Sequence, residues 1–446
     1  MSTYSRRDFI KLTGSAAVAG VAASATGSAV ASSKAPAGSP ILARKAELPK
    51  ARGQRVVVVG GGWSGLTIAK YLKKEDPKLD VVLVEKRATF FSCPISNLWL
   101  AGLVDMDFLT HSFLDAAKNN NYTFFNATVV DVDRSSRKVF TEQGYIDYDY
   151  LVLAPGIDYD YQAIGVNDPG DISRIRTEYP AAFMPGSEHL SLKTKLDYFE
   201  GGTFLLTVPD GNYRCLPGPY ERACMVASIL KKNKIKGKVV LLDANPDITI
   251  KKDGFHSAFN DLYKGYLDYI PSVKITGVDI DKRTVKSEFD EYSFDDAAIY
   301  PRVRGARLIE ELGMVDPQSP QKEANIDPFF YNLVGDKRVY ITGDARPMPY
   351  SKSGNTSNSE GKFVAKIIAA RANGKDIDKW EPPHTICYSM VNTNPMEAIS
   401  VDAYYAYNKQ TKSFGFDRVK MFENRDVAKG KATLEWARGL YRDMFG

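Results

Sequence analysis

Apolar and polar positions divide the chain into alternating strands and helices. Arg55 to Val59 contains four consecutive valines, the pattern of a parallel strand that is buried on both faces. Leu66 to Leu72 continues as a helix, and Val81 to Val84 is a second buried strand. A strand, a helix and a second strand in this order predict a unit built on a parallel sheet.

A glycine-rich turn joins the first strand to the helix. Gly60, Gly62 and Gly65 have the spacing G-x-G-x-x-G, with Trp63 and Ser64 between the last two. The first glycine permits a tight turn, the second lets the backbone approach a pyrophosphate, and the third lets the helix pack on the strand. The helix N-terminus attracts the phosphate charge. We therefore expect all five residues to bind a dinucleotide.

Glu85 ends the second strand, and Lys86 follows it. An acidic residue at this spacing is typical of a carboxylate that binds the ribose hydroxyl groups of a dinucleotide. Both residues are therefore candidates for cofactor binding. The motif by itself does not distinguish NAD from FAD.

Three later strands complete the expected nucleotide-binding unit. Lys138 to Thr141 and Tyr145 to Tyr148 predict a hairpin, and Asp149 to Gly156 predicts a buried strand that ends in a Pro-Gly turn. We expect Ala154 and Gly156, at the end of that strand, to contact FAD.

The strand Arg338 to Ala345 contains Gly343 and Asp344, a carboxylate suited to the ribityl hydroxyls or the pyrophosphate side. Ser357 to Ala370 predicts a helix with a Ser or Asn cap, whose positive N-terminal end would face the flavin. Lys352 lies just before this helix and is a further candidate for flavin contact.

The region from Leu192 to about residue 300 predicts a second Rossmann-like half. Its first strand is Gly201 to Val208 and its second is Lys238 to Asp243. The loop between them, residues 209–222, has no G-x-G-x-x-G and contains Arg214, Cys215 and several prolines. We infer that this half has lost nicotinamide binding; a pure spacer role is the alternative.

These segments predict an α/β protein with two Rossmann-like dinucleotide-binding domains, a glutathione-reductase-like FAD fold, and a C-terminal α+β segment. Residues 54–165 and 301–374 are expected to form the two parts of the FAD-binding domain, and residues 166–300 the second Rossmann-like domain. Residues 375–446 are expected to cap the flavin or to form an interface.

The N-terminal residues predict export. Arg6 and Arg7 form a twin-arginine signature, a weakly hydrophobic run follows from Leu12 to Val30, and Ala29-Val30-Ala31 is a cleavage pattern. We expect a Tat signal peptide over residues 1–31, a linker over 32–53 rich in Ala, Pro, Ser and Lys, and a mature protein in the periplasm. The Tat route carries proteins that fold before export, which suits an enzyme loaded with FAD in the cytoplasm.

Composition narrows the possible partners. The chain is 446 residues long with a net charge of +5 and no long basic run, so nucleic acid is not an expected partner. Beyond the export segment, no stretch is apolar enough to predict a transmembrane anchor. The four cysteines are Cys93, Cys215, Cys224 and Cys387, and neither they nor the four histidines have the spacing of a metal or haem site.

The motifs together resemble the flavoprotein subunit of flavocytochrome c sulfide dehydrogenase, a group related to sulfide:quinone oxidoreductases. The most specific segments are the glycine loop at 60–65, Cys93-Pro94-Ile95-Ser96-Asn97, the loop Tyr213 to Ala223, Gly343-Asp344-Ala345, and Thr385-Ile386-Cys387-Tyr388-Ser389.

The resemblance implies FAD in the first domain, with Cys93 able to bond covalently to the flavin and Asn97 nearby. It also implies a catalytic Cys215 beside the flavin that acts on a small sulfur substrate. Electrons would leave to a c-type cytochrome subunit. Arg214 and the start of a helix near Cys215 would favour its thiolate.

One position departs from what the resemblance leads us to expect. We expect the redox partner of Cys215 directly after Gly343-Asp344-Ala345, but that position is Arg346. Either Cys215 acts alone, or Cys224 or Cys387 replaces the partner, or the chain does not oxidise sulfide as the family does. Of the other two cysteines, Cys224 is expected in the core, and Cys387 is expected to be buried, with a minor chance of lying near the flavin.

Three functions remain open. The leading hypothesis is a periplasmic FAD-dependent sulfide dehydrogenase of the sulfide:cytochrome c type. A quinone-linked sulfide oxidoreductase is the enzymatic alternative. The third is a non-catalytic flavoprotein that assists a cytochrome or sulfur-oxidation partner.

Overall fold

The structure, a computed structural model, describes residues 40–408, 410–411 and 413–446. The predicted signal peptide and the first part of the predicted linker lie outside the described residues. The described part of that linker packs against the protein: it begins with α2 (Pro40–Ala43), and Ala46 donates its backbone N–H to the carbonyl of Tyr145 at 2.8 Å.

A six-stranded sheet forms the first unit, in the order β19-β20-β9-β1-β2-β5. Its centre is β1 (Arg55–Val59), which is fully buried and pairs in parallel with both β2 and β9. Long runs of Val and Leu in these strands fit a sheet covered on both faces. The other strands are β2 (Asp80–Glu85), β5 (Thr123–Asn126), β9 (Tyr150–Leu153), β19 (Asn332–Leu333) and β20 (Asp336–Ile341).

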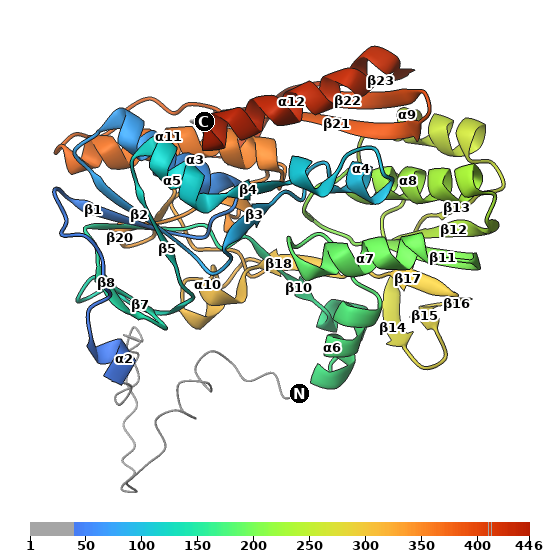
Figure 1. Ribbon diagram of the computed structural model, residues 1–446, viewed down its shortest axis with the longest axis horizontal. Helices are drawn as coiled ribbons and strands as arrows, with labels where there is room; N and C mark the ends of the chain where they lie inside the picture. Colours follow the sequence, from blue (N-terminus) through green and yellow to red (C-terminus); the bar gives the residue numbers. More distant parts are fainter. Residues whose placement is uncertain (1–39, 409, 412) are drawn as a thin grey trace, which may run out of the picture.

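Helices cover one face of this sheet. Figure 1 shows α3 (Trp63–Glu75), α5 (Phe113–Asn120) and α11 (Gly354–Ala372) on that face. The β-meander β6-β7-β8 lies on the other side. Its strands are β6 (Val129–Asp133), β7 (Lys138–Thr141) and β8 (Gly144–Asp147). The predicted hairpin is therefore confirmed as β7 and β8, and the predicted C-terminal helix as α11, which begins three residues earlier than expected.

The second unit is a four-stranded parallel sheet in the order β13-β12-β11-β17. Its strands are β11 (Gly201–Val208), β12 (Lys236–Asp243), β13 (Leu267–Ile270) and β17 (Asp296–Ala298). Helix α8 (Gly218–Asn233) follows β11 and packs on the sheet, as expected of a Rossmann-like half. The α/β class with two such sheets is confirmed.

The remaining helices and short strands lie between the strands of the two main sheets in the chain order. The helices are α4 (Ser96–Leu100), α6 (Pro169–Glu178), α7 (Ser187–Asp197), α9 (Lys252–Ser257) and α10 (Arg307–Glu311). The strands are β3 (Thr89–Phe91), β4 (Thr110–Ser112), β10 (Ile157–Asp160), β14 (Ile275–Asp279), β15 (Thr284–Ser287), β16 (Glu291–Ser293) and β18 (Arg302–Gly305).

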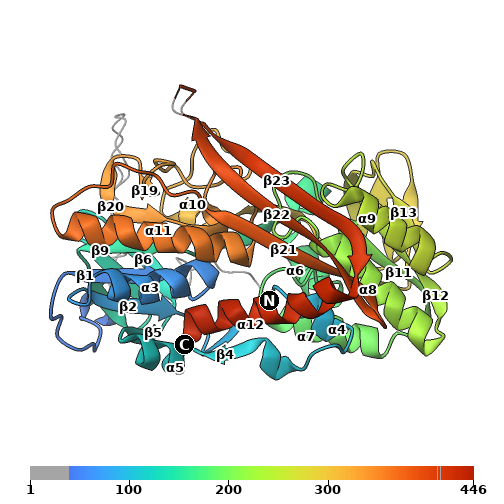
Figure 2. The ribbon, with the colours of Figure 1, turned by 90° about the horizontal axis from the view of Figure 1, so that it is seen from above.

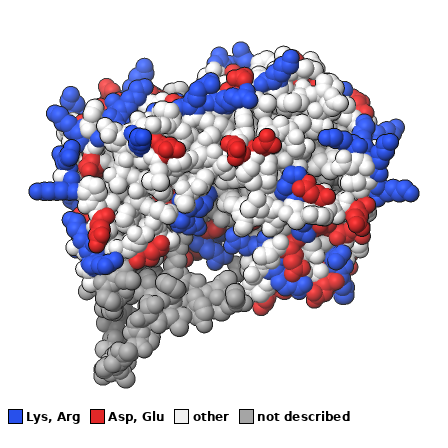
Figure 3. Space-filling model, in the orientation of Figure 1, with Lys and Arg blue, Asp and Glu red and all other residues white. Residues whose placement is uncertain are grey.

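The C-terminal segment bridges both units. It consists of β21 (His384–Thr393), β22 (Met396–Asn408), β23 (Ser413–Asp426) and α12 (Val427–Phe445). Figure 2 shows the three long antiparallel strands and α12 lying across the molecule, and β21 contacts both α8 and α11. This placement brings one strand of the C-terminal sheet to the boundary between the two Rossmann-like units. On the face shown in Figure 3, acidic and basic side chains are interspersed.

Candidate active site

A cavity of about 430 Å³ lies where the two units and β21 meet, within the size range of small-molecule and cofactor sites. Its lining contains 14 of the 15 predicted site residues. These are Gly60, Gly62, Trp63, Ser64, Glu85, Lys86, Cys93, Asn97, Ala154, Gly156, Cys215, Gly343, Asp344 and Lys352. Gly65 is the exception, because it packs beneath the loop.

The glycine loop has the geometry that its sequence predicts. Gly60 has φ +103°, and a Cβ there would overlap the carbonyl of Ala154. A Cβ on Gly65 would overlap the carbonyl of Gly60, so this glycine lets α3 approach β1. A Cβ on Gly62 would meet nothing within 4 Å. Gly62 is the N-cap residue of α3 and has no side chain that could bind the free N–H groups of the first turn. The start of α3 therefore opens onto the cavity, as a pyrophosphate site requires.

Glu85 is 5% exposed at the end of β2. Its Oε2 accepts the backbone N–H of Gly61 at 2.7 Å, and its Oε1 accepts the backbone N–H of Arg87 at 2.9 Å. Burial raises its pKa, but the Arg87 guanidinium and these hydrogen bonds outweigh burial and lower the pKa below its ordinary value. Glu85 is thus an ionised acceptor, suited to ribose hydroxyl groups.

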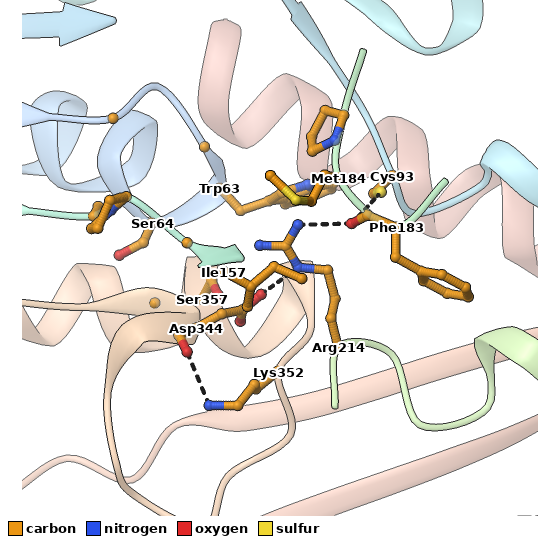
Figure 4. Close-up of a pocket in the computed structure, with 18 of the residues that line it drawn as sticks. Trp63, Ser64, Cys93, Ile157, Phe183, Met184, Arg214, Asp344, Lys352 and Ser357 are labelled. Atoms are coloured by element: carbon orange, nitrogen blue, oxygen red, sulfur yellow. Dashed lines mark hydrogen bonds and ion pairs between the residues drawn. The ribbon is translucent and has the colours of Figure 1, made fainter. Parts of the chain in front are cut away.

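Asp344 offers the cavity an unpartnered carboxylate oxygen. Its Oδ2 pairs with Nε of Arg214 at 2.6 Å, whereas its buried Oδ1 has no hydrogen-bond partner in the described part of the chain. Figure 4 shows Arg214 reaching across the cavity between Asp344 and the carbonyl of Phe183, to which its NH1 donates at 2.9 Å. A buried oxygen without a partner indicates that a polar ligand binds there. Oδ1 of Asp344 and the open glycine loop together fit FAD, which has hydroxyl groups for the first and a pyrophosphate for the second.

Lys352 lies beside the cavity, but its ammonium group is engaged within the protein. The side chain is 1% exposed, and Nζ donates to Glu323 Oε1 at 2.6 Å and to the carbonyl of Asp344 at 2.9 Å. It therefore supports the Asp344 loop rather than pointing freely at a ligand. The N-terminus of α11, capped by Ser353, contributes Gly354 and Ser357 to the cavity lining, in agreement with the predicted direction of this helix.

Cys93 is half-buried at the cavity wall. Its thiol donates to the carbonyl of Phe183 at 3.2 Å, and Nε2 of His189 lies 3.5 Å from the sulfur. Burial raises the pKa of this thiol to about 11, although Arg214 and Arg222 oppose the rise. The position agrees with a role near the flavin.

Cys215 and Cys387 meet in the cavity. Cys215 lies in the loop before α8, Cys387 lies on β21, and both thiols line the cavity. The interaction between the two thiols lowers the pKa of Cys387 against the effect of burial, and the same interaction together with burial raises the pKa of Cys215. The expectation that Arg214 and the helix start would lower the pKa of Cys215 was wrong: Arg214 pairs with Asp344, and the neighbouring Cys387 thiol and burial raise the pKa of Cys215.

Arg346 does not take part in the cavity. It is 0% exposed, and its Nε pairs with Oε2 of Glu360 at 2.6 Å. Cys224 is also fully buried, on α8, as expected. Of the alternatives for the partner of Cys215, the geometry favours Cys387. The signal for this was in the sequence, because Cys387 is part of the segment Thr385 to Ser389 on which the resemblance rests.

Three further polar residues at the cavity wall form a buried network. Asn97 donates to Oε2 of Glu221 at 2.8 Å, and its Oδ1 accepts from Nε of Arg222 at 3.0 Å. Glu221 also accepts the backbone N–H of Met390 at 2.7 Å. Burial raises the pKa of Glu221 to about 7 even though the Asn97 hydrogen bond lowers it. The sequence patterns did not single out Glu221 or Arg222.

In the second Rossmann-like unit, the carboxylate that could bind a ribose is already bound by other side chains. Asp243, at the end of β12, is 0% exposed, and its Oδ2 accepts the hydroxyl groups of Tyr220 at 2.7 Å and Tyr269 at 2.9 Å. An acidic residue at this place would bind the ribose of NAD. The engaged carboxylate supports the inference that this half does not bind nicotinamide.

Within residues 40–408, 410–411 and 413–446, no helix is both long and apolar enough to cross a membrane. The same residues contain no cluster of three or more His, Cys, Asp or Glu arranged to hold a metal ion.

Comparison with known protein families gives two matches. Residues 190–301 match the family described as sulfide dehydrogenase [flavocytochrome c] flavoprotein chain, central. Residues 54–177 match the pyridine nucleotide-disulphide oxidoreductase family. The two matched segments coincide with the second Rossmann-like unit and with most of the first.

A curated relative and two solved structures of similar sequence or fold are also oxidoreductases. The type II NADH:quinone oxidoreductase of Staphylococcus haemolyticus is 24% identical over 357 residues, which is 74% of this chain and 85% of the relative. The sulfide:quinone oxidoreductase of Aquifex aeolicus has a TM-score of 0.70 at 18% identity, covering 88% of this chain and 92% of that one. The NAD-dependent persulfide reductase of A. fulgidus has a TM-score of 0.60 at 16% identity, with 80% and 65% covered.

Two segments of this chain thus resemble the sulfide dehydrogenase flavoprotein and the pyridine nucleotide-disulphide oxidoreductase families, and the fold is similar to that of a sulfide:quinone oxidoreductase.

Proposed function

We propose that this chain is a periplasmic FAD-dependent oxidoreductase that oxidises sulfide or a related reduced sulfur compound and passes the electrons to a c-type cytochrome subunit. The observation that carries the proposal is the pair Cys215 and Cys387, which meets in the cavity that also contains the glycine loop and Asp344. The closed ribose position at Asp243 argues against NAD(P)H as the electron donor.

The residues that would hold FAD follow from the geometry. The start of α3 and the loop from Gly60 to Ser64 would bind the pyrophosphate, Glu85 the ribose, and Oδ1 of Asp344 a hydroxyl group of the ribityl chain. We extend the proposal to a covalent bond between Cys93 and the flavin, since Cys93 lines the same cavity. When bound, FAD supplies an acceptor that takes up two electrons together and releases them singly to a haem.

The chain's own groups would manage the sulfur substrate and its proton. Cys215 and Cys387 both line the cavity, so hydrosulfide could attack a disulfide between them. A new S–S bond would form to one sulfur, the disulfide bond would break, and its electron pair would leave with the other cysteine as a thiolate; FAD would be the two-electron acceptor in the prior oxidation of the two thiols. Glu221 is buried beside both thiols with a pKa near 7, so it can accept a proton from a thiol or from hydrogen sulfide at neutral pH.

The test uses purified, FAD-loaded protein without oxygen. Sulfide should bleach the flavin absorbance and then reduce added cytochrome c, and NADH should do neither. Replacement of Cys215 or Cys387 by Ser should abolish sulfide-dependent bleaching, whereas Cys224→Ala, the matched control in the core, should keep it. A fully flavin-loaded wild-type protein that sulfide does not bleach would refute the proposal. Unchanged cytochrome reduction in Cys215→Ser would instead favour a non-catalytic helper.

The covalent bond has a separate test. Denatured wild-type protein should retain the mass and the fluorescence of one FAD, and Cys93→Ser should lose both while keeping flavin before denaturation. Release of all flavin from the denatured wild type would refute the covalent bond and leave the sulfur chemistry standing.

One surface favours a second candidate acceptor, a membrane quinone. The edge strand β23 exposes apolar side chains: Phe416 is 57% exposed and Met421 is 50% exposed. Exposed apolar side chains of this kind occur at membrane or partner contacts. Sedimentation with lipid vesicles and sulfide-dependent reduction of a soluble quinone would favour this candidate, and cytochrome reduction without vesicle binding would reject it.

A further inference from the structure

The sulfur of Cys93 has one titratable side chain within hydrogen-bond distance in the described part of the chain. This side chain is His189, whose Nε2 lies 3.5 Å from the sulfur. His189 is 0% exposed and is not among the residues that line the cavity, whereas Cys93 is. A cofactor in the cavity would therefore contact Cys93 without displacing His189. A neutral imidazole has one nitrogen that can accept a proton, so the contact is suited to proton transfer from the thiol.

The segment just before α7 is fixed by hydrogen bonds. The hydroxyl group of Tyr159 accepts the backbone N–H of Phe183 at 3.0 Å. The carbonyl of Phe183 accepts the thiol of Cys93 at 3.2 Å and NH1 of Arg214 at 2.9 Å. His189 follows in the first turn of α7. The same segment therefore holds both the Phe183 carbonyl and the His189 ring against the sulfur of Cys93.

Cys93 is a protonated thiol at neutral pH. Burial has the largest effect and raises the pKa of the thiol to about 11. The charged groups that face the thiol come from four elements. Arg214 in the loop before α8, Arg222 on α8 and Arg87 after β2 oppose the rise in its pKa, and Glu188 on α7 adds to it. Because the thiolate is the nucleophilic form, Cys93 has to lose its proton before its sulfur can form a bond.

His189 is available to take up that proton. Burial, followed by the charges of Arg222 and Arg214, lowers the pKa of its imidazolium form to about 3. The ring is therefore neutral at neutral pH and holds a proton only in passing. The two guanidinium groups that disfavour the imidazolium also stabilise the thiolate that the proton leaves behind. The arrangement suits a transient proton acceptor and not a resting pair of thiolate and imidazolium.

We propose that His189 is the catalytic base of covalent flavin attachment, and that it takes the proton of Cys93 as the sulfur bonds to a methyl carbon of the flavin ring. This inference rests on the proposed function, because it deepens the proposed bond between Cys93 and FAD. It gives a role to a buried histidine that the sulfur chemistry at Cys215 and Cys387 does not use.

The attachment step balances in atoms and electrons. One C–H bond of the flavin methyl group and the S–H bond of Cys93 break, and one C–S bond forms. Two electrons and two protons stay with the flavin ring, so the product is the thioether of the reduced flavin and no atom is lost. The thiol proton passes through Nε2 of His189 on its way to the ring. The c-type cytochrome of the proposed function, or dioxygen in the purified protein, then takes up the two electrons, and the two protons leave to solvent or to oxygen.

The experiment measures covalent FAD in the full-length protein that is isolated with FAD bound. Denatured wild type should retain one FAD per chain by intact mass. His189→Gln keeps a polar side chain of similar reach that cannot take up a proton. This variant should bind FAD in the native state but hold less than about a tenth of it covalently, since a general base contributes a factor of about 10²–10⁴. His256→Gln, which changes a surface histidine paired with Asp247, should retain one covalent FAD.

Two further readouts separate proton transfer from packing. During incubation of FAD-loaded His189→Gln, the covalent fraction should rise faster as the pH increases, because hydroxide replaces the missing base. His189→Ala leaves a space of the size of the lost ring, and added imidazole should restore covalent attachment in this variant. Pyrrole has a similar shape but no basic nitrogen, so it should not restore attachment. If His189→Ala does not fold, His189→Gln decides.

The outcomes distinguish this inference from the proposed function. Complete covalent attachment in His189→Gln at isolation would overturn the role of His189 and leave the bond to Cys93 standing. Release of all FAD from denatured wild type would refute the covalent bond and this inference with it. Covalent attachment does not depend on sulfide, so failure of sulfide to bleach the flavin would refute the sulfur chemistry and not the role of His189.

Discussion

The buried ion pair of Arg346 and Glu360 should be a main support of the FAD site. Both side chains are 0% exposed, and Nε and Oε2 lie 2.6 Å apart. Oε1 of Glu360 accepts the backbone N–H of Gly343 at 2.8 Å, and the guanidinium group donates to the carbonyls of Met348 and Ser351, each at 3.2 Å. The pair thus joins α11 to the loop that presents Asp344.

The perturbation is Arg346→Met, which leaves Glu360 buried without its cation. Removing one partner of a buried pair costs about 3–5 kcal/mol, because the remaining charge has lost its compensation. The double variant Arg346→Met, Glu360→Gln should recover much of this loss, since a neutral amide can still accept from Gly343. An exposed pair gives the matched control: Arg438→Met, which breaks the surface contact with Glu435, should cost at most about 1 kcal/mol.

The assay is urea unfolding of the FAD-loaded protein, followed by tryptophan fluorescence and by flavin release. A loss of this size should lower the midpoint by roughly 1 M in Arg346→Met, and flavin should be released at or before that point. Arg438→Met should unfold at the wild-type midpoint. If Arg346→Met and Arg438→Met unfold alike, or if the double variant is less stable than Arg346→Met, the reasoning about the buried charge is refuted.

Three further predictions address the site. Gly65→Ala should purify with little flavin, because its Cβ would overlap the carbonyl of Gly60; a wild-type ratio of flavin to protein absorbance would contradict this. Glu221 has a folded pKa raised to about 7, so its neutral form stabilises the fold below the unfolded pKa and that stability, about 3 kcal/mol, is lost as pH rises to 7. Glu221→Gln should flatten the dependence of the unfolding free energy between pH 4.5 and 7, which urea titrations at several pH values would check. Asp344→Asn should weaken flavin binding, measured by equilibrium dialysis, and equal affinity would contradict a role for its unpartnered oxygen.

The local patterns in the sequence predicted the first Rossmann-like unit well. The roles of three features follow from the geometry of a strand or a turn, because each depends on residues that are close in sequence. These features are the valines of β1, the three glycines and Glu85. The hairpin of β7 and β8 and the helix α11 were predictable for the same reason. Gly60 and Gly65 each lie against a backbone carbonyl, as the motif predicts, because only a residue without a Cβ allows two backbones to approach this closely.

The roles of the cysteines depend on contacts between residues far apart in the sequence, and the spacing of the cysteines does not predict such contacts. Cys215 and Cys387 are separated by 172 positions in the numbering of the chain, and only the fold of β21 across the boundary of the two units brings them together. Arg346 stands where the resemblance leads us to expect the redox partner of Cys215, but it is buried against Glu360 and supports the loop that presents Asp344. Lys352 was expected at the flavin, but its ammonium group pairs with Glu323.

The sequence by itself determined the class of fold, the dinucleotide loop and the loss of the second glycine motif, since each is encoded in a short segment with its own backbone requirement. The tertiary structure decided which cysteine shares the cavity with Cys215, how the neighbours of each thiol shift its pKa and which cations remain available to the site. Those properties are electrostatic, and electrostatic interactions depend on distance and burial between residues that only the folded chain brings together.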